Sequence, residues 1–508
     1  MSKNMVFKVV GLPVFLILTY MVFTGVTYLV RPVHDNRMHM VGIKSEKEHI
    51  DVVYIGGSAS YVYFEPMKAF SDYGFTSYVL GTDAIHAECI LPEIKYIKEY
   101  QDPELFVIDA RPFQYYLESQ KDAGIRRVSD AMNVFDPARI ELVKECVDNG
   151  KIEKGDILSH ILDIAYYHTN YPNLSSSDAW ELIDNIDACD TKGCELYDIW
   201  SYLEKPDGFQ TDERGELAQN AEKVLREILT YCKDNDINLL FVDCPYSITK
   251  EHYAMYNSVA DIVRSYGYNF LEANDHYDEM GMDFATDYYN INHVNAIGAE
   301  KYTDFLADYI DANYELNDNR KDERFSTWID EAVDFQNYSE ELRENVKKRI
   351  TDAEAGVSQG DAIRGTEEFA KWCGYVKDYR YSLIAVGNGT SLYPGTTLDM
   401  NSLNNLGFDL NELYQSEKYM NVLADEMHEV SVPEEIDGVV SVQVGQINNK
   451  TEAVLTDKDD QYSIVIYNKE CSRGDTEGLN IVVFDNYYRT IIDSVTLQNE
   501  DGSIVIVR

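Results

Sequence analysis

Short apolar runs alternate with longer amphipathic segments over the first 310 residues, and this alternation constrains the fold more than any other feature. The run Leu239-Leu240-Phe241-Val242 is typical of a strand that is buried on both faces. Such strands are predicted at 51–55, 76–80, 105–109, 239–243 and 269–272, and helices at 87–99, 216–233, 252–266 and 299–312. A succession of this kind predicts an α/β fold in which helices cover both faces of a parallel sheet, giving three α/β/α layers.

The first predicted strand ends in a glycine-rich turn, Gly56-Gly57-Ser58. Such a turn exposes Ser58 at the carboxyl edge of the sheet, beside the N-terminus of the next helix, where α/β proteins hold ligands and nucleophiles. A serine is useful there when a base reaches it, and a neutral imidazole is the usual base near pH 7. His293 lies far downstream, just ahead of a helical run that begins near Gly298. Ser60 is the alternative nucleophile.

Gly56-Gly57-Ser58 and His293 together resemble the first and last blocks of the SGNH (GDSL-type) hydrolase superfamily, and the resemblance runs from about residue 51 to 313. It implies a flavodoxin-like domain at 51–314 in which Ser58 is the nucleophile and His293 the catalytic base. The sequence has no C-x-x-C pair and no Cys/His cluster with zinc spacing, so neither a metal nor a cofactor is predicted.

The last block departs from the superfamily at the position three residues before the histidine, which is often Asp and here is Asn290. Asp287 lies three residues further upstream. An asparagine can orient an imidazole by accepting its N–H, but it cannot stabilise the imidazolium by charge. We therefore expect either Asn290 or Asp287 to orient His293.

Acyl transfer also needs donors for the oxyanion, and the backbone N–H of Ser58 is one candidate. The second superfamily block implies Gly81 as another. The third block, usually Gly-x-Asn, is replaced here by Asp109-Ala110-Arg111. Two interpretations of Arg111 remain open: it donates to the oxyanion or to a substrate carboxylate, or it forms an ion pair with Asp109 or another acid.

An uncharged segment, Val9–Val30, precedes this domain. Its 22 residues would span about 33 Å as a helix, against a hydrocarbon core of ~30 Å. Lys3 and Lys8 precede it, which favours a cytoplasmic N-terminus. A cleaved signal peptide would have a shorter apolar region that ends in small residues. We therefore predict a transmembrane anchor at 1–30, a linker at 31–50 and the remaining chain outside the cytoplasm, on a bacterial cell membrane.

The net charge is −45, and such a surface repels nucleic acid and anionic lipid, so no nucleic-acid partner is predicted. The charge is also what a highly soluble surface would carry. Tyrosine is unusually frequent, with 39 residues, and aromatic faces can stack on sugars. This favours glycan ligands only slightly, because tyrosines are also frequent in protein cores.

The strand and helix alternation fails between about 112 and 213. This stretch holds helical pieces, the aromatic string Tyr166–Pro172 and a helix-capping run at Ser175–Asp178. An insertion near the carboxyl ends of the strands is expected to form a wall or lid over the site.

His168 could contact substrate there, or it could simply fill a gap among the aromatics. Asp83 and His86 are predicted to lie on a loop after Gly81.

A helical connector is predicted at 315–360 and a second, α+β domain at 361–508. Its strands are predicted at 381–386, 419–423, 439–444, 462–467, 479–484 and 491–497, with a helix at 400–406. The runs Ser382–Val386, Gly478–Asp485 and Ile492–Val495 resemble the ILEI/PANDER-like domain. The resemblance implies an extracellular interaction module, with glycans as one candidate ligand, and it supplies no catalytic residue.

These features predict two classes of function. The first is an anchored esterase or O-acyltransferase that acts on a glycan or an acylated envelope polymer. The second is a non-catalytic scaffold with a degenerate SGNH fold, which binds envelope sugars or a membrane acyltransferase partner. Ser58 with His293 favours the first class, whereas Asn290 and the missing Gly-x-Asn block favour the second.

Overall fold

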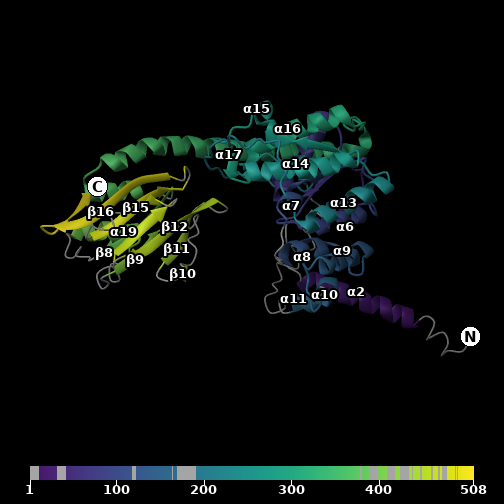
Figure 1. The fold of residues 1–508 in the computed structure, drawn as a ribbon, viewed down its shortest axis with the longest axis horizontal. Coiled ribbons are helices and arrows are strands. Elements are labelled where there is room, and N and C mark those ends of the chain that lie inside the picture. The colour runs from purple at the N-terminus through teal and green to yellow at the C-terminus, as the bar shows by residue number, and fades with distance from the viewer. Residues whose placement is uncertain are drawn as a thin grey trace, which may run out of the picture. The chain divides into compact units, whose positions relative to one another are not determined.

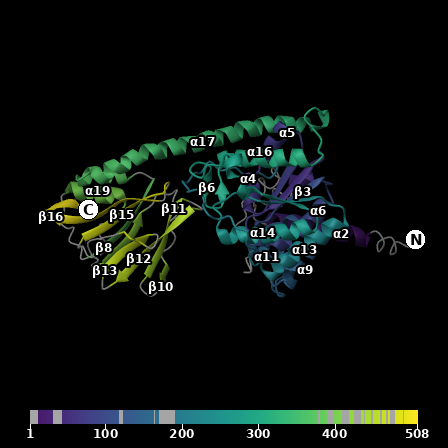
Figure 2. The same ribbon diagram turned by 45° about the horizontal axis from the view of Figure 1, so that its top comes forward.

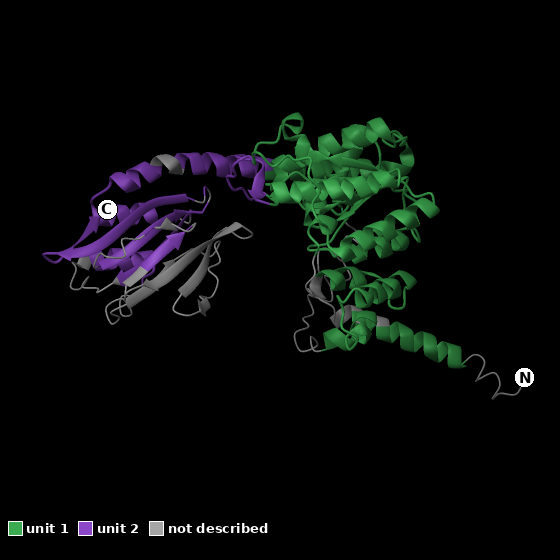
Figure 3. Ribbon diagram, in the orientation of Figure 1, with its two compact units in different colours: residues 1–197, 206–283, 292–342 green, residues 198–205, 284–291, 343–508 purple. Residues whose placement is uncertain are grey.

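The computed structural model of the chain forms two compact units (Figures 1 and 3). The first comprises Met1–Tyr197, Pro206–Asp283 and Asn292–Leu342, and the second Asp198–Lys205, Phe284–Ile291 and Arg343–Arg508. The structure describes residues 11–30, 42–116, 122–162, 164–168, 190–377, 380–388, 397–408, 418–423, 434–436, 439–446, 449–458, 461–466, 469–471, 478–486, 488 and 490–508.

The first unit is built on a five-stranded sheet in which every neighbouring pair of strands is parallel. Its strands are β1 (Val52–Gly56), β2 (Ser77–Gly81), β3 (Leu105–Asp109), β4 (Leu239–Asp243) and β5 (Asn269–Glu272). All five predicted strands are confirmed, with ends that differ by one residue or none. The first four are buried along their whole length, as their continuous apolar sequences require.

The order of the strands is β2-β1-β3-β4-β5, the doubly wound order of flavodoxin-like sheets. In this order the chain moves to one side after β1 and to the other side after β2. The carboxyl ends of β1 and β3 therefore flank the point where the winding reverses, which is where such folds bind ligands. Ser58 follows β1 and Arg111 follows β3, so both lie at this point.

Helices cover both faces of the sheet, as predicted (Figure 2). On one face lie α4 (Ser58–Tyr63), α5 (Pro66–Tyr73) and α16 (Ala296–Asn313), which pack together; on the other lie α6 (Ala87–Ile97), α13 (Gln219–Asp234) and α14 (Lys250–Ser265). The four helices predicted from periodicity correspond to α6, α13, α14 and α16. The short elements η3 (Ala273–Asp275), α15 (Tyr277–Met280), β6 (Tyr288–Asn290) and β7 (His293–Val294) connect β5 to α16.

Up to residue 168 the described part of the insertion after β3 is mainly helical, whereas its described residues 190–213 form turns and irregular structure. It comprises α7 (Arg111–Gln114), α8 (Asp122–Ala131), α9 (Pro137–Asp148), α10 (Ile157–Ile161) and α11 (Ile164–Tyr167). Helices α8 and α9 pack against α6 and thicken that helical layer. Arg127 of α8 also donates to the side chain and carbonyl of Asp83, on the loop after β2. The insertion therefore walls this loop, whereas the predicted helix cap at Ser175–Asp178 lies outside the described residues.

The second unit holds two antiparallel five-stranded sheets. One has the order β17-β16-β15-β8-β9 and the other β10-β11-β12-β13-β14. Their strands are β8 (Tyr381–Asn388), β9 (Lys418–Leu423), β10 (Glu434–Ile436), β11 (Val439–Gln446), β12 (Asn449–Lys458), β13 (Gln461–Ile466), β14 (Lys469–Glu470), β15 (Gly478–Asp485), β16 (Thr490–Glu500) and β17 (Ser503–Val507). The six predicted strands are confirmed; β10, β12, β14 and β17 are additional.

A helical layer packs on the sheet that contains β15. It includes α18 (Phe369–Val376), which sequence periodicity missed, and α19 (Thr397–Leu406), which contains the predicted 400–406 helix. Trp372 is fully buried in this core, and its Nε1 donates to Asp493 at 3.1 Å. Arg380 forms a buried ion pair with Asp485, at 2.6 Å from Nη2 to Oδ2. This unit therefore has its own core, as an independent domain requires.

The connector predicted at 315–360 is helical from residue 326 onward, where it forms part of one long helix, α17 (Ser326–Gly365), preceded by η4 (Glu323–Phe325). The division between the units falls inside α17, at Leu342/Arg343. The second unit also takes in 198–205 and 284–291, so its composition differs from the continuous 361–508 domain predicted from the sequence.

Near the N-terminus, α2 (Leu12–Val30) has 19 residues and no charged side chain, and many of its apolar side chains are exposed. However, none of the helices in the described ranges is both long enough and apolar enough to cross a membrane. The transmembrane helix predicted within 1–30 is therefore not supported by the structure.

Candidate active site

The structure brings Ser58 and His293 together at the carboxyl edge of the parallel sheet. Ser58 is the first residue of α4, directly after β1, and His293 begins β7. The Oγ of Ser58 lies 2.6 Å from Nε2 of His293. In the neutral ring that carries its proton on Nδ1, Nε2 accepts the hydroxyl proton of Ser58. Both side chains are partly exposed, so the pair is open to a ligand.

The turn that presents Ser58 depends on close packing between β1 and β3. A Cβ on Gly56 would lie 2.5 Å from the Cβ of Asp109, so no larger residue fits at that position. Asp109 holds the turn through its carboxylate, which accepts from the N–H of Gly57 at 3.3 Å and from the N–H of Arg111 at 2.9 Å. Burial raises the pKa of Asp109, while the charge of Arg111 and these backbone donors oppose the shift.

The segment that carries His293 is held from three sides. The hydroxyl of Tyr63, at the other end of α4, lies 2.9 Å from the carbonyl oxygen of Asn292. Nη1 of Arg111 donates to the same carbonyl at 3.2 Å. On the other side of His293, the side chain of Asn295 caps α16 by accepting from the N–H of Ile297 at 3.0 Å. Helix α4 therefore positions both members of the pair, because it begins with Ser58 and ends with Tyr63.

The environment of His293 keeps its ring neutral. Burial, and to a smaller extent the nearby positive charge of Arg111, lowers the pKa of His293 to about 3. The ring is therefore able to accept a proton from Ser58 at every ordinary pH. The proton affinity of such a ring rises when negative charge develops beside it, and this happens in the transition state of acyl transfer.

Arg111 is the cation of the site, and its guanidinium forms no ion pair with Asp109 or with any other carboxylate that the structure describes. Instead it lies over the ring of Tyr246, 4.6 Å from the centroid. Nη1 is occupied by the carbonyl of Asn292, but Nε and Nη2 are buried and have no hydrogen-bond partner in the described part of the chain. Of the two interpretations that the sequence left open, the geometry favours a donor held ready for an anion.

The residues predicted to orient His293 are both buried, Asp287 completely and Asn290 almost so. Oδ1 of Asp287 accepts from the hydroxyl of Thr286 at 2.8 Å. Asp287 and Asn290 belong to the second compact unit, whereas His293 belongs to the first. Which of them orients the imidazole therefore stays a prediction.

Two other predicted residues have structural roles here. Gly81 ends β2 beside Gly56, and a Cβ on it would lie 2.3 Å from Cδ1 of Tyr61, so a glycine is required by packing. Its role in the oxyanion site stays a prediction. Ser60 is fully buried and donates to the carbonyl of Gly57 at 2.7 Å, which favours Ser58 as the nucleophile.

The remaining residues singled out in the sequence lie around the site loop or away from it. Asp83 is paired with Arg127, and His86 is buried at the N-cap of α6. His168 is exposed, with Nδ1 3.1 Å from the carbonyl oxygen of Ala165. Residues 169–172 of the aromatic string lie outside the described residues.

Sequence reasoning missed the supporting roles of Tyr63, Asp109 and Asn292. Asp109 could have been found as the last residue of a predicted strand, since side chains at strand ends line the sheet edge. Tyr63 and Asn292 act through contacts between distant segments, and no local spacing indicates them.

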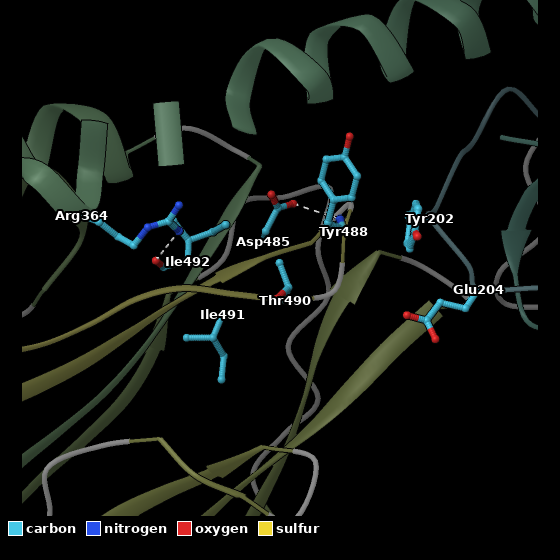
Figure 4. Close-up of a pocket in the computed structure, with 8 residues that line it drawn as sticks. All are labelled: Tyr202, Glu204, Arg364, Asp485, Tyr488, Thr490, Ile491 and Ile492. Atoms are coloured by element: carbon cyan, nitrogen blue, oxygen red, sulfur yellow. Dashed lines mark hydrogen bonds between the residues drawn. The ribbon is translucent and has the colours of Figure 1, made fainter. Parts of the chain in front are cut away.

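The second unit contains a separate hollow of about 510 Å³. It is lined by Tyr202, Glu204, Arg364, Asp485, Tyr488, Thr490, Ile491 and Ile492 (Figure 4). The ring centroids of Tyr202 and Tyr488 are 5.6 Å apart, and Trp200 packs edge-on against Tyr488. Tyr202 and Glu204 are exposed, so this hollow offers an aromatic face next to a carboxylate.

Comparison with known proteins does not assign this chain to a family. No protein-family model matches the sequence, and a search of curated proteins finds no significant match.

Proposed function

We propose that this chain is a serine-dependent esterase or O-acyltransferase with an SGNH-type site in its first unit. The observation that carries the proposal is the 2.6 Å contact between Ser58 Oγ and His293 Nε2 at the switch point of a doubly wound sheet. The free donors of Arg111 support it, because acyl transfer develops negative charge next to the nucleophile.

The proposed reaction begins when Ser58 Oγ attacks the carbonyl carbon of an ester and its proton passes to Nε2 of His293. The tetrahedral oxyanion is stabilised by Arg111 and by the backbone N–H of Ser58. The C–O bond to the leaving alcohol then breaks, and His293 returns its proton to that alcohol, which leaves an acyl group on Ser58. Attack by water completes hydrolysis, whereas attack by a hydroxyl of an acceptor completes acyl transfer.

The test is the hydrolysis of a simple activated ester, p-nitrophenyl acetate, by the full-length chain. Replacing Ser58 by Ala should lower kcat/KM by three orders of magnitude or more, because loss of the nucleophile removes the covalent route. Ser60→Ala is the matched control, two residues away on the same helix, and should leave kcat/KM within about twofold. Equal activity of the wild type and Ser58→Ala would refute the proposal.

For the substrate we propose a glycan or an acylated envelope polymer outside the cytoplasm. The uncharged segment Val9–Val30 behind Lys3 and Lys8 supports an anchored, exported chain, and the strong negative charge argues against nucleic acid. Digestion of intact spheroplasts with an added protease tests this: the region from about residue 42 onward should be degraded. Protection of that region would contradict export.

For the second unit we propose an ILEI/PANDER-like binding module. The exposed Tyr202, the Tyr488 ring and the carboxylate of Glu204 supply the stacking and hydrogen-bonding groups that sugars use. Tyr202→Ala should weaken retention of the chain on envelope polysaccharide and leave turnover of p-nitrophenyl acetate unchanged. Unaltered retention would leave this hollow without a role in glycan binding.

The alternative function is a non-catalytic scaffold that binds envelope sugars or a membrane acyltransferase partner. Asn290 in place of the usual aspartate favours it, as does the very low pKa of His293, which makes the free ring a weak base. Ester turnover that depends on Ser58 excludes this alternative, so the activity measurement decides between the two.

A further inference from the structure

A second cluster of chemically active side chains lies at the opposite, amino edge of the parallel sheet. His49 and Asp51 immediately precede β1, and Glu104 immediately precedes β3. Nε2 of His49 lies 2.9 Å from Oε2 of Glu104 and 3.8 Å from Oδ1 of Asp51. One donor atom from each of the three residues falls within 4.8 Å of the others.

Asp51 is the unusual member of this cluster. The residue is 1 % exposed, and its Oδ1, on the side of His49, has no hydrogen-bond partner in the described structure. Its other oxygen, Oδ2, accepts from the N–H of Thr76 at 2.7 Å, from the Thr76 hydroxyl at 2.9 Å and from Asn319 at 2.9 Å. A buried carboxylate oxygen without a partner is costly unless a cation completes it.

The cluster is built on a rigid frame. The carbonyl of Asp51 accepts from the N–H groups of Glu104 and Leu105, which fixes the starts of the two strands against each other. The hydroxyl oxygen of Thr76 lies 2.8 Å from the carbonyl oxygen of His49, so its one proton is shared between this carbonyl and Oδ2 of Asp51. These contacts fix the backbone positions from which the three side chains extend. The groups that donate to Oδ2 of Asp51 provide the outer hydrogen bonds that ligating carboxylates commonly have.

We propose that His49, Asp51 and Glu104 form a binding site for one zinc ion, with Nε2, Oδ1 and a Glu104 carboxylate oxygen as ligands. Zinc takes imidazole nitrogen and carboxylate oxygen at roughly 2.0–2.2 Å. Two ligands on a tetrahedral ion are then about 3.4 Å apart, and the two distances from His49 Nε2 lie on either side of that value. An imidazole ligand disfavours calcium and magnesium, which prefer all-oxygen sites.

The surroundings suit metal entry. A cavity of about 670 Å³ opens beside the cluster and is lined in part by His49, Asp51 and Asn319. The side chains of His49 and Glu104 are 41 % and 39 % exposed, so an ion can reach both. A water molecule from this cavity would fill the fourth position.

The role of this zinc site is structural. Ser58 is seven residues beyond Asp51, roughly 20 Å away at the rise of a strand, so the ion takes no part in the proposed acyl transfer. It joins the segment before β1 to the start of β3 and neutralises the buried carboxylate. The inference does not depend on the proposed function.

The experiment uses the full-length chain without a histidine tag, stripped of metal with EDTA and then dialysed. Titration with zinc chloride followed by elemental analysis should find one zinc per chain, and cobalt(II) should give the visible absorption bands of a low-symmetry site. Zinc at 100-fold above its dissociation constant should raise the Tm of the first unit by roughly 3 °C. Glu104→Gln and His49→Ala should each weaken zinc binding at least 100-fold.

Two controls keep the result decisive. His276→Ala removes the exposed pair that His276 forms with Glu279 at 2.6 Å, which is not joined by a third ligand group among the described residues, and it should bind zinc like the wild type. Ser58→Ala should also bind zinc normally. Since His49 and Glu104 are partly exposed, circular dichroism should show both cluster variants folded. No stoichiometric zinc, or zinc binding that survives both cluster variants, would show that the cluster is only an ion pair between His49 and the carboxylates.

Discussion

Ser58 and His293 are 235 positions apart in the sequence and yet lie within hydrogen-bond distance. Their meeting depends on a few supporting side chains. Asp109 holds the turn before Ser58, and Tyr63 and Arg111 both bond the carbonyl of Asn292, next to the histidine. At this scale the site is a pair of reactive groups held by neighbours that are themselves buried or hydrogen-bonded.

The first prediction at the residue scale concerns the protonation of His293. Its pKa is about 3 in the folded chain and would be about 6.5 when unfolded. Between these values the unfolded state binds more protons, so the contribution of His293 lowers stability as the pH falls from about 6.5 toward 3. In NMR spectra the ring of His293 should not titrate between pH 8 and 5. A titration midpoint near 6.5 for His293 would contradict the account.

The second prediction concerns Arg111. Replacement by Gln removes the cationic donor, and kcat on an activated ester should fall about 10²–10³-fold, as for loss of an oxyanion donor. The pKa of His293 should rise at the same time, because the positive charge that lowers it is gone. Arg127→Gln is the matched control, since Arg127 pairs with Asp83 on the adjacent loop. Equal kcat values for the two variants would remove Arg111 from the chemistry.

At the scale of elements, β1 to β4 of the parallel sheet were predictable because their largely apolar runs are buried along their whole length. Local sequence also indicated the turn at Gly56-Gly57-Ser58 and the helix that begins shortly after His293, whereas the cap that Asn295 forms on that helix was seen only in the structure. The strand β12, by contrast, begins Asn449-Lys450-Thr451-Glu452, a polar stretch without a strand signal, and was missed. Glu104 was missed as a partner of His49 because the two are 55 residues apart and meet only through strand pairing.

The prediction at this scale compares two adjacent glycines. Gly56→Ala places a methyl group 2.5 Å from the Cβ of Asp109, where both strands are fixed, and should destabilise the first unit by about 1–3 kcal/mol. Gly57→Ala has its nearest contact at 3.7 Å and a negative φ of −82°, so it should change stability little. Thermal melts of the two variants make the comparison. Equal loss in both would mean that the turn, rather than the strand contact, requires glycine.

At the scale of the whole molecule, the chain forms two units that have separate cores. Arg380→Met would leave Asp485 buried without its partner, which typically costs about 3–5 kcal/mol. In differential scanning calorimetry this variant should lower the transition of the second unit, while Gly56→Ala should lower that of the first. If each variant shifted a single common transition, the two units would have to unfold as one.

The central claim is that Ser58 carries the covalent chemistry, and the most direct test is to find the modified residue. The full-length chain is treated with a fluorophosphonate, which reacts with activated serines, and its proteolytic peptides are mapped by mass spectrometry. We expect one adduct on Ser58, lost in Ser58→Ala, greatly slowed in His293→Ala and retained in Ser60→Ala. An adduct on another serine, or none on a folded chain, would contradict the claim.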